Sequence, residues 1–191
     1  MIDYPDYAAS SLRLLVMEAL RTHKTKSLLP MLGDEDVIVR SAVARELQIR
    51  GEREAFEYTL KACGDPRNYV REIAAFTLGQ FGTPTYPFRA EALPKLSELA
   101  VDASGEVRAA AVSALGHLHA REYENVILAS ATDSESDVRA SAAFALGYMS
   151  PTPDVVHALE ALLLDPDEGV REWAEFGIES INGVEFKFDN G

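Results

Sequence analysis

The sequence predicts an all-α fold, a right-handed α-solenoid of about five stacked helix pairs with a capping helix at the N-terminus. The first observation is a repeat: "DASGEVRAAAVSALGHLH" at residues 102–119 returns as "DSESDVRASAAFALGYMS" at residues 133–150. The second is a helical period of apolar residues in each copy, and the third is the lack of a convincing strand pattern. Self-similarity at about 30 residues is typical of a solenoid, because one unit cannot bury its apolar face alone.

Alignment on a Val-Arg pair recovers five copies of this segment. Each copy starts with an aspartate and carries an arginine six residues later. The ten residues of this ladder are Asp34, Arg40, Asp65, Arg71, Asp102, Arg108, Asp133, Arg139, Asp165 and Arg171. Successive arginines lie 31, 37, 31 and 32 residues apart, so six extra residues separate the second copy from the third.

Each copy provides the second helix of a pair, and the segment before it provides the first. The apolar stripe of the fourth copy follows the 3.6-residue helical turn and consists of Val138, Ala142, Ala145, Leu146 and Met149. The expected first helices contain "TKSLLPMLG", "EREAFEYTLKACG", "RAEALPKLSELAVD", "REYENVILASA" and "PDVVHALEALLLD". Polar turns such as "TDSES" provide helix N-caps.

A further helix is expected near residues 7–21, where it caps the first repeat. The expected organisation is a single domain, with the cap at residues 1–26, the repeats at 27–181 and a tail at 182–191. Residues 83–94 hold the extra segment, rich in proline and aromatic residues, and we expect an exposed loop that is either a specificity element or a tolerated linker. The tail alternates apolar and charged residues, which does not favour a helix.

An aspartate, five residues, an arginine and an Ala-rich helix ending in Leu-Gly together resemble HEAT repeats, in particular the short HEAT-like type associated with phycobilin lyases. The resemblance covers residues 27–181. It implies that the ladder links one repeat's turn to the next repeat's helix and has a structural role. The fifth copy departs from the pattern, because Gly177-Ile178 replaces Leu-Gly and Trp173 stands where other copies have small residues.

The net charge of −13 is concentrated in the second half of the chain. Residues 1–100 carry 13 Lys+Arg against 14 Asp+Glu, whereas residues 101–191 carry 5 against 17. Such a field repels phosphate backbones and attracts basic partners, although acidic charge can also serve solubility alone. The acidic start "MIDYPDYAAS" lacks the features of a signal peptide, and no apolar run approaches the roughly 18 residues of a membrane span. We therefore expect a cytoplasmic protein without a nucleic-acid or membrane partner.

No residue pattern in the chain predicts catalysis, a metal site or a cofactor. His117 and His119 are two residues apart, which on one helix would point them about 200° apart. No His-Glu pair occurs, and Cys63 has neither a nearby histidine nor a second cysteine, so a small buried apolar residue is its expected role. The glycines follow helix ends and form no phosphate-binding loop. We expect no catalytic residue, no metal and no cofactor.

The positions that differ between copies are the candidates for function. Counted from each valine of the Val-Arg pairs, positions 2 and 6 lie away from the core stripe, on a face expected to be concave. Aromatic residues and carboxylates gather there, and the predicted partner-binding residues are Glu72, Phe76, Phe144, Tyr148, Glu172, Phe176, Glu175 and Glu179. The alternative is that the aromatic rings only fill space between neighbouring helices.

These features favour a non-catalytic protein-binding module that holds a basic partner, for example an immunity protein that neutralises a cationic toxin. The repeat subtype also implies a phycobilin-lyase-like protein that handles a chromophore. A HEAT-like DNA-repair glycosylase is a weaker alternative, because such a protein needs a basic groove for phosphates.

Overall fold

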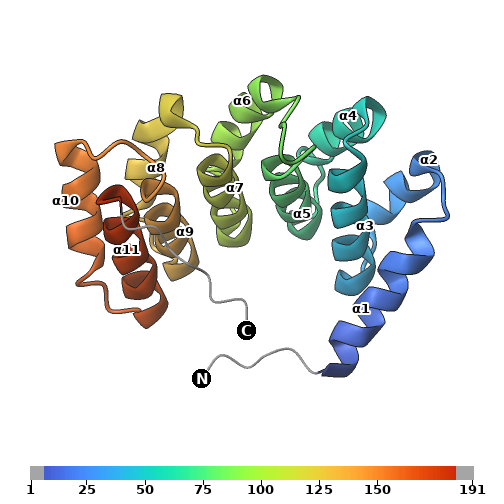
Figure 1. Ribbon diagram of the computed structural model, residues 1–191, viewed down its shortest axis with the longest axis horizontal. Coiled ribbons are helices and arrows are strands. Elements are labelled where there is room, and N and C mark those ends of the chain that lie inside the picture. The colour runs from blue at the N-terminus through green and yellow to red at the C-terminus, as the bar shows by residue number, and fades with distance from the viewer. Residues whose placement is uncertain (1–6, 184–191) are drawn as a thin grey trace. The chain divides into compact units, whose positions relative to one another are not determined.

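The computed structural model describes the backbone of residues 7–183 and the side chains of residues 14–183. All regular secondary structure in this part of the chain is helical (Figure 1). The chain divides into two compact units, residues 1–88 and residues 89–191. Within the described range, no helix combines the length and the apolar character that a bilayer crossing needs.

The first unit contains the capping helix and two repeats. Its elements are α1 (Tyr7–Leu20), α2 (Thr25–Leu28), a 3-10 helix (Leu29–Gly33), α3 (Val37–Arg50), α4 (Arg53–Ala62) and α5 (Asn68–Gly79). Helix α1 packs against α3, and α3 and α4 both pack against α5. The first helix of the first repeat is short because Pro30 stands at the start of the 3-10 helix, where its missing N–H costs nothing.

The second unit contains three complete repeats. Its elements are α6 (Arg89–Leu99), α7 (Gly105–His117), a 3-10 helix (Arg121–Tyr123), α8 (Glu124–Ser130), α9 (Ser136–Leu146), α10 (Pro153–Leu162) and α11 (Glu168–Ile181). Helices α7, α9 and α11 pack side by side in one row, and α6, α8 and α10 pack against that row (Figure 1). Helix pairs stacked in this way confirm the predicted all-α, repeat-solenoid fold class.

The predicted loop at residues 83–94 is partly wrong, because α6 already begins at Arg89. Pro94 lies inside this helix and is exposed, although proline removes a backbone hydrogen bond there. The apolar side of α6 is buried through Ala92, Leu93 and Leu96. Burial of that side outweighs the lost hydrogen bond and keeps the segment helical.

The core follows the predicted stripe closely, and its small residues let neighbouring helices approach. In α9 and the turn after it, the stripe residues Val138 and Met149 are 0% and 5% exposed. Two glycines at helix ends, Gly116 and Gly147, also have a packing role. A Cβ added at Gly116 would lie 2.8 Å from the Cα atom of Ala145, and one at Gly147 would lie 3.0 Å from the Cα atom of Gly177. These glycines therefore allow α7, α9 and α11 to touch.

Candidate binding surface

All five aspartates and arginines of the ladder make the same bonds within their own repeats. Each aspartate carboxylate accepts a hydrogen bond from the amide two residues later, at 2.8 to 3.0 Å. Each arginine donates from Nη1 to the backbone carbonyl of its own aspartate, at 2.7 to 3.2 Å. The repeated spacing of six residues therefore fixes the turn that leads into every second helix.

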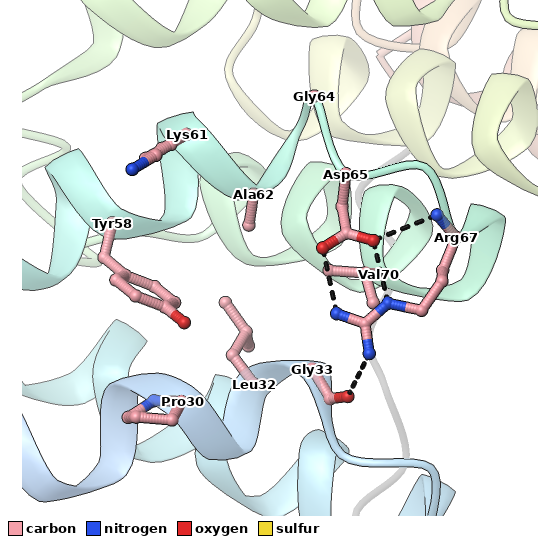
Figure 2. Close-up of a pocket in the computed structure, with 10 residues that line it drawn as sticks. All are labelled: Pro30, Leu32, Gly33, Tyr58, Lys61, Ala62, Gly64, Asp65, Arg67 and Val70. Atoms are coloured by element: carbon pink, nitrogen blue, oxygen red, sulfur yellow. Dashed lines mark hydrogen bonds and ion pairs between the residues drawn. The ribbon is translucent and has the colours of Figure 1, made fainter.

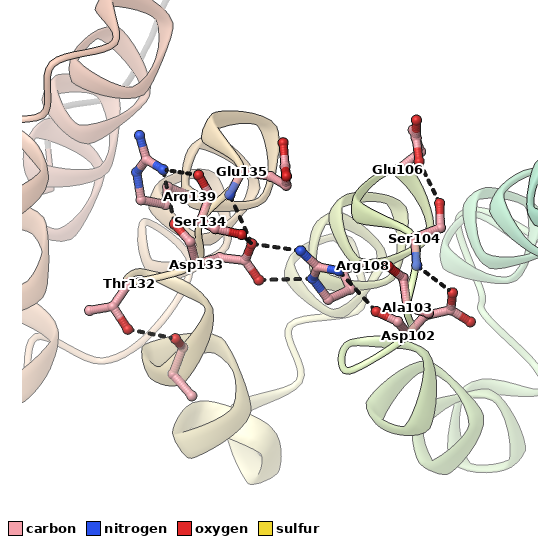
Figure 3. Close-up of polar contacts among 11 residues, drawn as sticks. Asp102, Ala103, Ser104, Glu106, Arg108, Thr132, Asp133, Ser134, Glu135 and Arg139 are labelled. Atoms are coloured by element: carbon pink, nitrogen blue, oxygen red, sulfur yellow. Dashed lines mark hydrogen bonds and ion pairs between the residues drawn. The ribbon is translucent and has the colours of Figure 1, made fainter.

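In the second unit, Arg108 and Arg139 also reach the next repeat, and Figure 3 shows the bond from Arg108 to Asp133. Arg108 binds both carboxylate oxygens of Asp133 at 2.8 Å, and Arg139 binds those of Asp165 at 2.7 and 2.9 Å. The bond to the arginine lowers the pKa of each aspartate. The resemblance implied a link from the turn of one repeat to the helix of the next. The structure shows the reverse order, because the helix of one repeat binds the turn of the next. The turn places its carboxylate beside the preceding helix.

In the first unit, Asp65 is held by an arginine of its own turn instead. Arg67 binds its carboxylate oxygens at 2.8 and 2.9 Å, and this bond lowers the pKa of Asp65 to about 2. The same guanidinium donates to the backbone carbonyl of Gly33 at 3.2 Å and so reaches the preceding repeat (Figure 2). Arg40 lies over the ring of Tyr69, 4.9 Å from its centre.

A hollow of about 320 Å³ lies beside this bridge, where the first helix of the first repeat is short (Figure 2). Its wall includes Pro30, Leu32, Tyr58 and Val70. The guanidinium of Arg67 closes one side, but its nitrogens already bind acceptors. The lining therefore mixes apolar side chains with Lys61 and the Asp65–Arg67 ion pair, whose charged groups are already bonded to each other.

The most distinctive surface is an aromatic cluster in the second unit, on the row of second helices. It consists of His117, His119, Phe144, Tyr148, Trp173 and Phe176. Phe144 lies at its centre, with ring centres 4.9 Å from His117, 5.1 Å from Tyr148 and 5.3 Å from Trp173. Their interplanar angles of 60°, 68° and 85° are edge-to-face contacts, which stabilise aromatic pairs.

The cluster remains open on its outer side. Trp173 is 43% exposed, and Phe144, Tyr148 and Phe176 are partly exposed. Burial, with a smaller contribution from the neighbouring His119, lowers the pKa of His117 and so favours its neutral imidazole. The cluster is therefore an apolar surface held in place by its own ring contacts and accessible to another molecule.

The cluster joins three of the predicted partner-binding residues, Phe144, Tyr148 and Phe176. Glu172, Glu175 and Glu179 are exposed on α11, the helix that carries Trp173 and Phe176. Glu72 and Phe76 belong to α5, in the first unit, and Phe76 is 44% exposed. The aromatic face and the acidic face predicted for α11 thus lie on one helix, whereas the other predicted pair is carried by α5 of the first unit.

Sequence reasoning missed Trp173, His117 and His119 as members of the cluster. Trp173 is the only tryptophan of the chain and replaces Ala42, Ile73, Ala110 and Ser141 of the other copies, so its position carried a signal. On one continuous helix, His117 and His119 would point about 200° apart. Helix α7 ends at His117, and His119 takes a positive φ of 47°. That turn places the His119 ring 5.1 Å from Tyr148.

Two exposed carboxylates of α11 are not neutralised by the side chains that the structure describes. Among residues 14–183, no lysine, arginine or histidine forms an ion pair with Glu175 or Glu179. The arginines of this unit are engaged elsewhere, Arg89 with Glu122 and Arg139 with Asp165. The aromatic cluster is therefore bordered by negative charge.

Comparisons with known proteins agree with this architecture. A family model described as HEAT repeats matches residues 25–104 and 93–179. The chain is similar to the solved structure of YibA from Escherichia coli, with 25% identity and a TM-score of 0.78 over 98% of this chain and 67% of that one. No curated protein matches the sequence.

Two further solved structures are similar in fold alone. The complex of CpcE and CpcF of phycocyanin lyase from Nostoc has 21% identity and a TM-score of 0.66, over 81% of this chain and 97% of that one. A designed armadillo repeat protein in complex with the peptide (KR)4 has 18% identity and a TM-score of 0.60, over 94% of this chain and 96% of that one.

Proposed function

Because this chain belongs to the HEAT-repeat family, we propose that it is a non-catalytic protein-binding module whose binding surface is the aromatic cluster. The observation that carries the proposal is a self-supporting group of partly exposed rings with Trp173 at 43% exposure. Tryptophan and tyrosine are enriched among the residues that dominate binding energy, because they offer a large contact area at a small entropic cost.

The partner is a basic protein or a basic segment of one. Residues 101–191 carry 5 Lys+Arg against 17 Asp+Glu, and the exposed carboxylates of α11 lie beside the rings. Such a field raises the association rate of a cationic partner. A solenoid of similar fold is described in complex with the basic peptide (KR)4, which supports a basic segment as the class of ligand. An immunity protein that neutralises a cationic toxin is one role of this kind.

The (KR)4 peptide is a defined probe for this function. We expect it to bind the protein in a fluorescence anisotropy titration at low ionic strength. The double substitution Phe144→Ala with Glu172→Lys removes the central ring and reverses one charge, so the affinity falls at least about tenfold. The matched control is Glu160→Lys, which makes the same charge change at an exposed position of α10.

The outcome depends on comparing the two variants. Glu160→Lys should keep the melting temperature of the parent, whereas loss of the Phe144 ring contacts should lower that of the double variant, so the titrations are run at a temperature at which circular dichroism shows both variants to be folded. Equal losses of affinity in the two variants would mean that net charge alone drives binding, and no binding of the peptide would contradict a basic partner.

A second candidate function is the handling of a linear tetrapyrrole, favoured by the aromatic cluster together with the likeness to phycocyanin lyase subunits. Flat aromatic rings provide a stacking surface for a conjugated chromophore. Mixing the protein with a bilin and following the absorbance spectrum tests this candidate, and an unchanged spectrum removes it.

A further inference from the structure

Arginine side chains lie on aromatic rings repeatedly within the first unit. Tyr69 has Arg40 4.9 Å and Arg67 5.5 Å from its ring centre. Arg53 lies 5.1 Å from the ring centre of Phe88 and 5.7 Å from that of Phe56. These distances are within the range of cation–π attraction, so the chain pairs its own guanidinium groups with its own rings there.

In the second unit, the described residues place no such cation on the rings of Phe144, Tyr148 and Trp173, whose neighbours are other rings. Trp173 nevertheless has the indole ring, which attracts cations most strongly among the aromatic side chains. Its exposed fraction of 43% leaves it accessible to a cation from another molecule.

Acceptors for that cation stand beside the rings. Glu172 lies one helical turn before Phe176, and Glu179 lies about one turn after it, so both carboxylates border the cluster on α11. The carboxylate of Glu179 makes no ion pair among the described residues. An exposed indole and exposed carboxylates on one helix therefore offer a stacking surface together with hydrogen-bond acceptors.

These two features together favour a guanidinium over an ammonium group. A guanidinium is planar and weakly hydrated, so it stacks on a ring and still donates in-plane hydrogen bonds to a carboxylate. A lysine ammonium is a compact, strongly hydrated charge and makes only the electrostatic part of this interaction.

We propose that Trp173 is a recognition site for an arginine side chain of the partner, which stacks on the indole and donates to an exposed carboxylate of α11. The inference rests on the proposed protein-binding function and specifies the ligand chemistry of the same surface. The partner is thus an arginine-bearing segment, and lysine does not replace arginine at the position that contacts Trp173.

The test uses the fluorescence of the protein itself, because Trp173 is its only tryptophan. Two peptides of equal length and charge, octa-arginine and octa-lysine, are titrated into the full-length protein. Octa-arginine is expected to change the tryptophan emission and to bind about tenfold more tightly, as stacking of a partly desolvated cation predicts. Octa-lysine binds through charge alone and changes the emission little.

Variants then separate stacking from charge, with labelled peptides and anisotropy as the readout. Trp173→Leu should bind both peptides equally, with the affinity that the parent protein has for octa-lysine. Trp173→Phe keeps a ring and should retain part of the arginine preference. The matched control is Tyr123→Leu, which removes a partly exposed ring of the second unit that lies outside the aromatic cluster and should leave the preference unchanged.

Each result has a distinct meaning. Equal affinities of the parent protein for the two peptides, or an arginine preference that survives in both Trp173 variants, would overturn the guanidinium site and leave the protein-binding function standing. Failure of both peptides to bind at low ionic strength would contradict the basic partner itself. Circular dichroism melting of both Trp173 variants verifies that the substitutions act on binding and not on folding.

Discussion

Arg139 and Arg171 occupy the same position in successive repeats but have different partners. Both donate to two backbone carbonyls of their own turn. Arg139 also binds the carboxylate of Asp165, and the two side chains are only 15% and 7% exposed. Within the described residues Arg171 has no carboxylate on a following repeat to bind. Substituting Arg139 and Arg171 in turn therefore separates the contribution of the bridge between repeats from that of the hydrogen bonds within one turn.

We predict that Arg139→Met lowers the free energy of unfolding by about 3 kcal/mol, because it leaves the carboxylate of Asp165 poorly solvated and without its partner. Arg171→Met should cost only about 1 kcal/mol, since it removes only hydrogen bonds to carbonyls. Urea denaturation of both variants measures the difference. Similar losses of unfolding free energy in the two variants would show that the bridge adds no stability beyond the hydrogen bonds to the backbone carbonyls of the same turn.

The same bridge predicts a pH dependence of the difference between parent and Arg139→Met. Arg139 lowers the pKa of Asp165 in the folded state, so the bridge contributes its full stability above the unfolded aspartate pKa of about 4. That contribution is lost as the pH falls through the lowered pKa. Urea denaturation at several pH values should show that the free energies of unfolding of the two proteins converge below about pH 4. A difference that stays constant with pH would exclude Asp165 as the cause.

At the scale of elements, the approach of α7 to α9 depends on Gly116. A Cβ at this position would lie 2.8 Å from the backbone of Ala145, and a backbone atom cannot move aside as a flexible side chain can. We predict that Gly116→Ala lowers the free energy of unfolding by about 2 kcal/mol through overpacking.

The matched control for this prediction is Gly64→Ala. The nearest atom to its added Cβ is the carbonyl oxygen of Lys61 at 3.6 Å, an ordinary contact. Alanine there should be neutral or slightly stabilising, because it restricts the unfolded chain. Thermal melting of both variants measures the difference. A Gly116→Ala variant as stable as Gly64→Ala would show that this glycine does not set how closely α7 and α9 approach.

The helices could be predicted from the sequence because their burial is periodic. The stripe from Val138 to Met149 is buried in α9 as the spacing indicates. The first helix of the first repeat is broken into two short segments. The sequence predicts residues 89–94 both in the inserted loop and in a first helix, of which the helix is confirmed by α6. In both places a proline, Pro30 or Pro94, competes with the burial of an apolar face, and only the packed structure decides which effect is larger.

The binding surface could be predicted only in part, for a related reason. The repeat alignment identifies Phe144 and Phe176 because they occupy the same position in different copies. It overlooks Trp173, whose position holds no other aromatic residue in the chain. Ring contacts between α9 and α11 depend on how the helices stack, and the alignment of copies contains no such distances.

At the scale of the whole molecule, charge and aromatic stacking should respond differently to salt. The excess of acidic residues in 101–191 acts over distances that salt screens, with a Debye length of about 10 Å at 0.1 M. Stacking on Trp173 is short-ranged. We predict that raising the salt from about 0.05 to 0.5 M weakens octa-lysine binding markedly more than octa-arginine binding. Parallel titrations measure this, and identical salt slopes would argue against a short-range contribution.

The bridges between repeats also bear on how such a protein can evolve. Arg108 on one copy binds Asp133 on the next, and Arg139 binds Asp165 in the same way. The fourth copy therefore encodes both an acceptor for its predecessor, Asp133, and a donor for its successor, Arg139. A duplicated gene segment of this length would bring its own attachment chemistry at both ends, so the array could gain a copy without compensating changes in its neighbours.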